Sequence, residues 1–391
     1  MVKRLPLQDQ RRTLAMAQTV GSFDQVVERK RLGFRGLCHS AFAQRQGLVI
    51  ETRYHDSVNV LQEMFADQAT APVVSAPFDR PEWYALLEQK ADLIPFVAMA
   101  GEQDVRGAIT LSRSDGTMTA LRNWYSFTWR PVLPSGERGN ALLEAMARSL
   151  RRQGHRAIFA PVPEEDGSAS RIAHAFAKAG WRVEVTRCDT NHFLEIGGRS
   201  FAEYWAARPG TLRTTLKRKG TKIQTQVFDR FDPDAWSDYE RVYASSWKPS
   251  EGAPVMLRAF AEAEGQAGRL RLGLATCEGQ AVAAQFWTVE NAAAYIHKLA
   301  HLESHKELSA GTTLSAALFK HVIDVDRVAT VDFGTGDEPY KRDWMEATRP
   351  RYQIDCLDMR QPRAWVSLAR LAARRLNEPA VPALARYPLE G

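Results

Sequence analysis

The order of the predicted helices and strands repeats once along this chain, and the repeat constrains the fold more than any other feature of the sequence. Apolar periodicity predicts the order helix, strand, strand, strand, helix, strand, first before about Gly197 and then again after it. In residues 139–155, for example, apolar residues share one helix face, at Leu142, Leu143, Met146 and Leu150. Repetition on this scale predicts an α/β (α+β) fold of two tandem units, with mixed, mostly antiparallel sheets and flanking helices.

The length of the chain supports the same division, because 391 residues are many for a single compact domain. We expect an N-terminal domain at residues 47–196 and a C-terminal domain at residues 197–360. Residues 1–46 are rich in Arg and Gln without sustained periodicity, which predicts a weakly ordered extension. Residues 361–391 are predicted to form an Arg-rich C-terminal helix and tail. One face of that helix carries Trp365, Leu368, Leu371 and Ala372.

Composition narrows the class of protein. The chain has 45% hydrophobic and 25% charged residues, as ordinary folded proteins have, and no apolar run long enough to span a bilayer. The N-terminus lacks the apolar segment of a secretory signal, so we expect a cytoplasmic protein. The net charge of +6 favours anionic ligands without naming one. Four widely spaced cysteines are expected to be reduced thiols: Cys38, Cys188, Cys277 and Cys356.

The segment HKELSAGTTL (residues 305–314) has the features of an anion-binding loop. A strand ends before it, a turn of small residues follows Lys306, and a helix opens at Thr312 or Thr313. A helix N-terminus presents free backbone N–H groups, and a pyrophosphate would suit them. The alternative is a plain helix start without a ligand. The loop residues concerned are Lys306, Ser309, Ala310, Gly311, Thr312 and Thr313.

Other familiar sites are not supported. Gly334 and Gly336 lack the third glycine of the dinucleotide fingerprint, and Pro339 interrupts the place where its helix would run. No G-x-S-x-G signature occurs, so a covalent serine mechanism has no support. Three histidines recur at every fourth position: His297, His301 and His305. Their segment is predicted to be a strand and H-E-x-x-H is absent, so we expect no metal.

Three segments together resemble a known family. KELSAGTTL, TVDFGTGDEPYKRDW and LRTTLKRKGTKI are similar to the CelD-like branch of the GNAT acyltransferases, described with cellulose or exopolysaccharide biosynthesis. That branch is similar in turn to the Fem-type peptidyl transferases, which carry two GNAT-like units. The resemblance covers roughly residues 48–360, and Ala310 stands where the family has proline. The matching residues are Arg213, Leu216, Lys217, Arg218, Ser309, Gly311, Thr312, Asp332, Phe333, Gly334, Gly336, Asp337, Glu338, Tyr340 and Lys341.

The resemblance implies an acyltransferase that moves an acyl group, acetyl in the simplest case, from acyl-CoA to an amino group on a sugar or polysaccharide precursor. The donor pyrophosphate would lie at the loop Lys306–Thr313, and backbone N–H groups of His297, Lys298 and Leu299 would orient the thioester. The first unit, which lacks a matching loop, would be structural or bind the acceptor.

The resemblance also suggests catalytic roles for four residues of the DFGTGDEPYK segment. Asp332 or Asp337 would accept the proton of the attacking amine, and Tyr340 would protonate the departing thiolate. Lys341 would hold an anionic acceptor group or the developing oxyanion. The alternative for each residue is a structural role in a turn or an ion pair.

Two other functions remain open. An aminoacyl-tRNA could be the donor, in which case the basic helix Arg213–Lys222 would contact RNA phosphates. This helix has few aromatic residues and no coiled-coil insertion occurs, so nucleic acid ranks second. The chain could also be a degenerate GNAT scaffold that only binds a partner. For the Arg-rich tail we favour a docked helix, with an anionic membrane at the inner face or a cyclic dinucleotide as the alternatives.

Overall fold

The computed structural model describes residues 50–65, 72, 74–102 and 104–377. Every described residue belongs to one compact unit, Leu48–Gly391, which is the second of the two units into which the chain divides. The predicted N-terminal extension, residues 1–46, therefore lies outside the described residues, as does the end of the tail.

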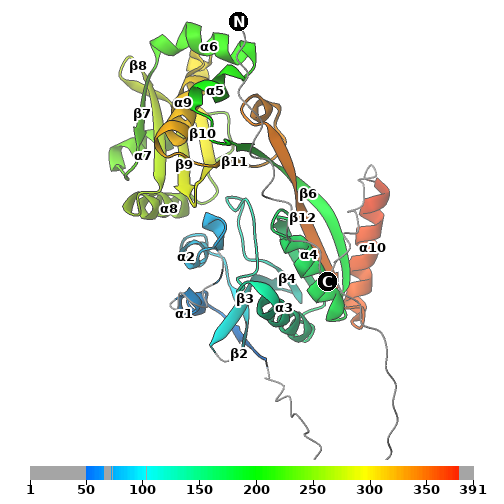
Figure 1. Cartoon of the computed structure of the whole chain (residues 1–391). Helices are drawn as coiled ribbons and strands as arrows, with labels where there is room; N and C mark the ends of the chain where they lie inside the picture. Colours follow the sequence, from blue (N-terminus) through cyan, green and yellow to red (C-terminus); the bar gives the residue numbers. More distant parts are fainter. Residues whose placement is uncertain (1–49, 66–71, 73, 103, 378–391) are drawn as a thin grey trace, which may run out of the picture. The chain divides into compact units, whose positions relative to one another are not determined.

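The second unit contains helices and strands in alternation (Figure 1). The strands are β1 (Glu51–His55), β2 (Phe96–Glu102), β3 (Val105–Ser114), β4 (Thr117–Ala120), β5 (Arg156–Val162), β6 (Arg182–Glu195), β7 (Gln224–Phe228), β8 (Leu270–Cys277), β9 (Gln280–Glu290), β10 (Ala293–His301), β11 (Thr330–Thr335) and β12 (Ala347–Leu357). The α-helices are α1 (Val60–Phe65), α2 (Pro81–Lys90), α3 (Gly136–Leu150), α4 (Ser168–Lys178), α5 (Phe201–Ala206), α6 (Gly210–Lys219), α7 (Pro233–Ala244), α8 (Pro254–Gln266), α9 (Ala310–Lys320) and α10 (Pro362–Asn377). Short 3₁₀ segments cover Pro77–Asp79, Gly220–Lys222, Glu303–Leu308 and Pro339–Asp343, and a π turn covers His321–Val325.

The predicted repeat is present in the element order. A strand, two helices, three strands, a helix and a strand occur from β1 to β5 and again from β7 to β11. Each copy contains one parallel strand pair, β4 with β5 and β10 with β11, and the other pairs are antiparallel. The predicted α/β class with a mixed, mostly antiparallel sheet is thus confirmed.

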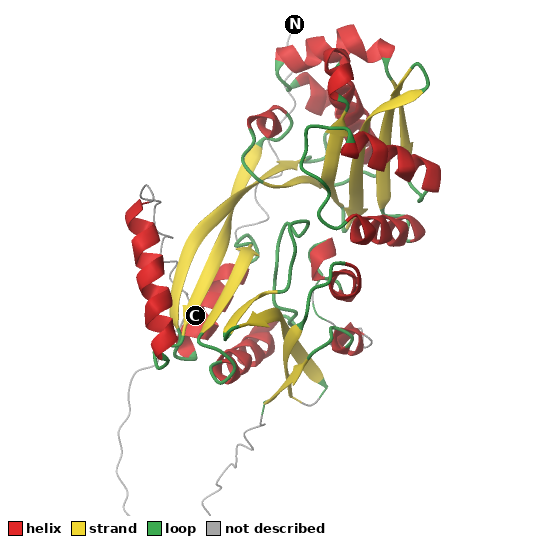
Figure 2. Ribbon diagram, turned by 180° about the vertical axis from the view of Figure 1, so that it is seen from behind, coloured by secondary structure: helices red, strands yellow, loops and turns green. Residues whose placement is uncertain are grey.

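The number of sheets differs from our expectation of one in each copy. All twelve strands form a single hydrogen-bonded sheet in the order β1-β2-β3-β4-β5-β12-β6-β11-β10-β9-β8-β7. The long strands β6 and β12 lie side by side and join the two copies (Figures 1 and 2). Because β12 inserts between β5 and β6, the last strand of the second copy satisfies backbone groups that would otherwise leave an edge in the first.

Local sequence accounts for several of these elements. Proline occupies the first position of α2, α7 and α8, where its missing N–H costs no hydrogen bond. The predicted apolar face of α3 is buried. The helix α9 packs closely on the sheet because Gly273 of β8 has no side chain: a Cβ there would lie 2.8 Å from Leu318.

The C-terminal helix α10 is docked by a different face from the one we predicted. Leu368 and Leu371 are partly buried as expected, and Ala364 is fully buried. Trp365 is 60% exposed, and Ala372 is exposed as well. Helical spacing placed Trp365 next to the apolar face, but the docked stripe lies on the side of Ala364. Among the described residues, no helix is both long and apolar enough to cross a membrane.

Candidate active site

The strands β10 and β11 diverge in the middle of the second copy. Their parallel pairing comprises three residue pairs and ends at Tyr295 and Asp332. β10 continues to His301 without a partner on that side among the described strands, and it carries a bulge between Ile296 and Lys298. Backbone groups of the predicted donor-orienting residues 297–299 are therefore available for a ligand.

The helix α9 begins close to the end of β10. Ser309 adopts a left-handed conformation, with a φ of +53°, and turns the chain into the helix. Gln285 of β9 donates a hydrogen bond to the carbonyl of Gly311 at 3.1 Å, which ties the first turn to the sheet. The first N–H groups of a helix have no partner within it, so those of residues 310–312 are available. The predicted loop thus meets the free part of β10.

The two threonines and the lysine of this loop differ in their surroundings. The Thr313 side chain is buried, and its hydroxyl donates to the carbonyl of Ser309, one turn earlier in the chain, at 3.4 Å. Thr312 is partly buried. Lys306 is exposed and lies 3.6 Å from Glu303, a surface ion pair that leaves it free to move.

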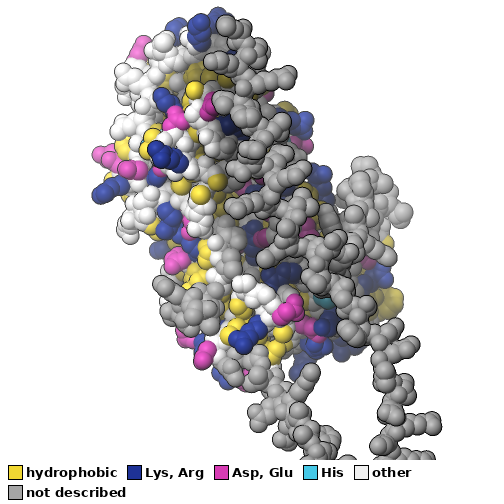
Figure 3. Space-filling model, in the orientation of Figure 1, with side chains coloured by type: hydrophobic (Ala, Val, Ile, Leu, Met, Phe, Trp, Pro, Cys, Tyr) yellow, Lys and Arg dark blue, Asp and Glu magenta, His cyan; other side chains and the backbone are white. Residues whose placement is uncertain are grey.

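One cation near the loop was missed by our reading of the sequence. Lys219, the last residue of α6, donates to the Ser309 hydroxyl at 3.2 Å. Its neighbours Lys217, Arg218 and Lys222 are exposed, and none has a carboxylate partner among the described residues. Lys and Arg side chains are visible where α6 lies, at the top of Figure 3. The run of basic residues was a signal, but the sequence alone did not bring it next to Ser309.

The imidazole of His297 belongs to the core. Its Nε2 lies 2.8 Å from the Thr288 hydroxyl, and the rings of Phe127 and Phe286 lie 5.3 and 5.0 Å away. Burial lowers the pKa of His297 to about 3, so the ring is neutral. Only the backbone groups of His297 can therefore contact an acyl donor. No cluster that could hold a metal ion occurs in the part of the chain that the structure describes.

The two aspartates among the four predicted catalytic residues are engaged in ion pairs. Asp332 is buried, and its carboxylate accepts hydrogen bonds from the Asn191 amide, the Gly334 N–H and Arg349 at 2.7–2.8 Å. Asp337 is exposed and contacts His192 and Arg342, and these hydrogen bonds lower its pKa. Because these partners stabilise its charged form, Asp337 is a weaker base than an isolated aspartate.

Lys341 closes the turn after β11. It is 3% exposed, donates to the carbonyls of Thr335 and Gly336, and lies 2.8 Å from Glu338. With these three partners the ammonium is saturated, since it has three donor protons. This is the structural role that we named as its alternative.

Tyr340 differs from the other three. Its side chain is 42% exposed, and its ring lies edge-on to Phe333 at 5.7 Å. Burial of the hydroxyl and the charge of Glu338 raise the pKa of Tyr340 to about 12. The hydroxyl therefore stays protonated at neutral pH and can donate a proton.

A cavity of about 440 Å³ lies beside α7 and the α7–α8 connection. Its lining includes Lys248 and Glu251, which our sequence analysis did not single out. Glu251 pairs with Lys298 of β10 at 2.9 Å, so the side chain of one of the residues predicted to orient the donor contacts a residue of the cavity lining. Burial, followed by the charge of Lys298, lowers the pKa of Lys248 to about 8. These residues are far apart in sequence, and no spacing pattern could have paired them.

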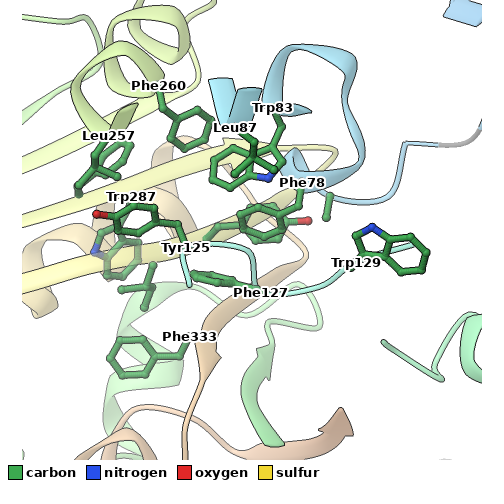
Figure 4. Close-up of a cluster of buried hydrophobic side chains, with 14 of the residues drawn as sticks. Phe78, Trp83, Leu87, Tyr125, Phe127, Trp129, Leu257, Phe260, Trp287 and Phe333 are labelled. Atoms are coloured by element: carbon green, nitrogen blue, oxygen red, sulfur yellow. The ribbon is translucent and has the colours of Figure 1, made fainter. Parts of the chain in front are cut away.

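The first copy contributes to the same region through the segment that precedes α3. Tyr125 and Phe127 of this segment lie among side chains of α8 and β11 (Figure 4). Tyr125 donates its hydroxyl to Glu251 at 2.6 Å. A Cβ on Gly334 would lie 3.0 Å from the Phe127 ring.

Comparison with known proteins agrees with this geometry. Residues 210–342 match the family described as "Acetyltransferase (GNAT) domain". A search of the curated proteins found no match. The matched residues run from the start of α6 to the turn after β11, so they include the diverging strands and the loop before α9.

Solved structures with a similar fold cover more of the chain than the family match does. FemX is 10% identical with a TM-score of 0.54, over 79% of this chain and 98% of its own. A conserved protein of unknown function from Bacteroides thetaiotaomicron is 11% identical with a TM-score of 0.52, over 78% of this chain and 100% of its own. A tandem GNAT protein from the clavulanic acid biosynthesis pathway is 12% identical with a TM-score of 0.46, over 78% and 98%. Residues 210–342 are thus similar in sequence to the GNAT acetyltransferase domain, and FemX and the Bacteroides protein share the fold over most of the chain.

Proposed function

We propose that this protein is an acyl-CoA-dependent N-acyltransferase, which moves an acyl group, acetyl in the simplest case, to an amino group. The observation that carries the proposal is the junction of β10 and α9. Free backbone of β10 from His297 to Leu299 lies before a helix N-terminus that begins at Ala310. This arrangement suits a thioester next to a pyrophosphate.

The residues at the junction fit such a donor. The N–H groups at the start of α9 would bind the pyrophosphate, aided by the helix dipole and by Lys219. Gly311 leaves room there, since a Cβ at this position would meet nothing closer than His301 at 3.6 Å. The N–H groups of β10 would bind the thioester carbonyl and the negative charge that develops on it.

Acyl transfer requires that the amine lose a proton before its nitrogen attacks the thioester carbonyl. Asp332 and Asp337 are held in ion pairs, which disfavours either carboxylate as the group that accepts the proton of the amine. We assign this role to Lys248, which lines the cavity. With a pKa of about 8, a fraction of Lys248 is neutral at physiological pH and can accept the proton. The C–S bond breaks as the C–N bond forms, and Tyr340 donates its proton to the thiolate.

The acceptor class rests on the resemblance of the DFGTGDEPYK segment to the CelD-like branch. We propose an amino sugar or a polysaccharide precursor. Because α10 is rich in arginine and Trp365 is exposed, we also propose that the tail contacts an anionic membrane surface from the cytoplasm, with a cyclic dinucleotide as the alternative ligand. Co-sedimentation of the full chain with anionic liposomes tests the membrane contact; an unbound protein would contradict it.

One observation favours a second candidate donor. Lys217, Arg218 and Lys222, on and after α6, have no carboxylate partner in the part of the chain that the structure describes. They would suit a longer polyanion such as the phosphates of an aminoacyl-tRNA. Fold similarity to FemX is compatible with this donor but does not select it.

Calorimetric titration with acetyl-CoA, a longer acyl-CoA and a charged tRNA separates these functions. We expect an acyl-CoA to bind and to release free thiol when an amine acceptor is added. Binding of the charged tRNA alone would replace this proposal with the Fem-type function. Binding of none of the three would leave a scaffold protein.

A further inference from the structure

Glu251, in the connection between α7 and α8, is held by groups from three separate segments. Its Oε1 accepts hydrogen bonds from Lys298 of β10 at 2.9 Å and from the Tyr125 hydroxyl at 2.6 Å. Among the described residues, its Oε2 accepts only a long contact from the Tyr239 hydroxyl, at 3.5 Å. A carboxylate has about four acceptor positions, two on each oxygen. Oε2 therefore keeps capacity for another donor.

The ammonium that binds Glu251 is enclosed by aromatic rings. Lys298 Nζ lies 4.7 Å from the ring centroid of Trp124, 4.5 Å from that of Tyr125 and 5.3 Å from that of Tyr243. Ring faces attract cations within about 6 Å. A primary ammonium of the protein itself thus occupies a cage of three rings and a carboxylate, which indicates the kind of group that this region selects.

Glu251 also lines a cavity with space for a ligand. The cavity of about 440 Å³ has Glu251 in its lining and falls in the size range of small-molecule sites. Trp236, Tyr243, Pro254 and Leu257 give it largely apolar walls. A ligand there would bury a ring or chain against apolar surface while its cationic end reaches Oε2.

We propose that Glu251 binds the ammonium of the acyl acceptor, and that the acceptor is a primary amine carried on a ring or chain with an apolar face. As an assignment of the acceptor site, this rests on the proposed N-acyltransferase function. Lys298 and Tyr125 are positioning residues, because they fix Oε1 and leave Oε2 directed to the ligand. Since Tyr125 belongs to the first copy, that copy contributes to acceptor binding through its contact with Glu251.

The structural alternative is that the pair of Glu251 and Lys298 only braces the α7–α8 connection against β10. The two roles predict different results. If Glu251 is only a brace, its replacement changes the stability of the protein but not its relative affinity for amines and alcohols. If Glu251 binds an ammonium, the protein prefers an amine to an alcohol of the same shape, and the replacement removes this preference.

The test uses pairs of probes that differ in this one group, at pH 6.5 where the amines are charged. D-glucosamine is compared with D-glucose, and cyclohexylamine with cyclohexanol, by saturation-transfer NMR on the full chain. We expect each amine to bind about tenfold more tightly than its alcohol, as a charge-assisted hydrogen bond would give. Glu251→Gln should abolish this difference. The two pairs together report whether the apolar walls prefer a sugar or a hydrocarbon ring.

A second variant covers the case in which Glu251→Gln does not fold. Ser250→Trp places a large side chain on an exposed residue of the cavity lining and leaves the carboxylate in place, so it should block both amines. Wild-type protein without amine preference, or a preference that survives in both variants, would overturn the proposal. Acetyl-CoA is titrated into the same samples: amine preference without acetyl-CoA binding would remove the proposed function but leave the ammonium site.

Discussion

Lys219 Nζ donates a hydrogen bond to Ser309 Oγ across 3.2 Å, which joins the basic end of α6 to the residue before α9. The loop Lys306–Thr313, where we propose that the acyl donor binds, therefore has a positive charge beside it that comes from a helix about ninety residues earlier in the chain. A free helix N-terminus and a neighbouring cation act on an anion in the same direction. This relationship makes the electrostatics of donor binding testable at a single side chain.

Lys219→Gln is expected to weaken acetyl-CoA binding by about 1.4 kcal/mol, roughly tenfold in Kd, because one charge-assisted contact to phosphate is lost. The variant should also reduce the salt dependence of binding. Calorimetry at two ionic strengths measures both effects. Lys320→Gln, at the opposite end of α9, is the matched control and should bind as the wild type does. Equal losses in the two variants would contradict a specific role for Lys219.

Asp332→Asn should reduce stability, since the carboxylate is buried and paired with Arg349. Loss of one partner of a buried pair costs about 3–5 kcal/mol, and the partial exposure of Arg349 should bring the loss to about 2–3 kcal/mol. Urea unfolding measures it, with Asp343→Asn on the exposed surface as the control. A stable Asp332→Asn protein that has lost turnover would instead indicate the general base of our sequence analysis.

Gly334→Ala should be more destabilising than an alanine at another left-handed glycine. Gly334 has a φ of +68°, and a Cβ there would press on the Phe127 ring at 3.0 Å. Gly279 has a φ of +78° and open space around it, so Gly279→Ala carries only the backbone cost of about 1–2 kcal/mol. Chemical denaturation compares the two. In a Phe127→Leu background the difference between them should shrink; an unchanged difference would show that the ring does not cause it.

Lys248 provides a test based on pH. Its pKa in the folded protein is about 8, below the ordinary value of 10.5, so protonation opposes folding. The destabilisation caused by the charge on Lys248 is at its full size below about pH 8 and decreases as the pH rises toward 10.5. Lys248→Met should therefore raise the free energy of unfolding at pH 7 and raise it less at pH 10. The groups that face Lys248 are Lys298, Glu338, Lys341 and Glu251.

Urea unfolding at the two pH values provides the measurement, and Lys222→Met, at an exposed position, is the control. The same gain in stability at pH 7 and pH 10 would contradict the lowered pKa of Lys248. The proton-accepting role would then lose its support.

The sequence predicted the local features of this fold well. Helical periodicity identified the buried face of α3. The turn of small residues after a strand predicted a helix start at Thr312 or Thr313, within three residues of the observed start of α9 at Ala310. These features depend on neighbours within a few residues, which periodicity and turn chemistry report directly. The repeated order of elements followed from the same signals.

Long-range partners were not predictable in this way. The insertion of β12 beside β5 depends on which strand edges meet, and a strand's sequence does not name its partner. The pair of Glu251 and Lys298, and the pair of Asp332 and Arg349, likewise join separate elements. For this reason the sequence could name Asp332 or Asp337 as a base without showing that Asp332 has three hydrogen-bond partners.

The central claim is that the N-terminus of α9 binds the pyrophosphate of an acyl-CoA. The most direct test is the affinity for acetyl-CoA of proteins in which Gly311 is replaced. A methyl group fits there, since its nearest neighbour would be His301 at 3.6 Å, but a leucine would cover the N–H groups of the first turn. We predict that Gly311→Ala binds acetyl-CoA nearly as the wild type does, and that Gly311→Leu, with an unchanged unfolding midpoint, loses about 2 kcal/mol, roughly thirtyfold in Kd. Undiminished binding by a folded Gly311→Leu protein would contradict the account.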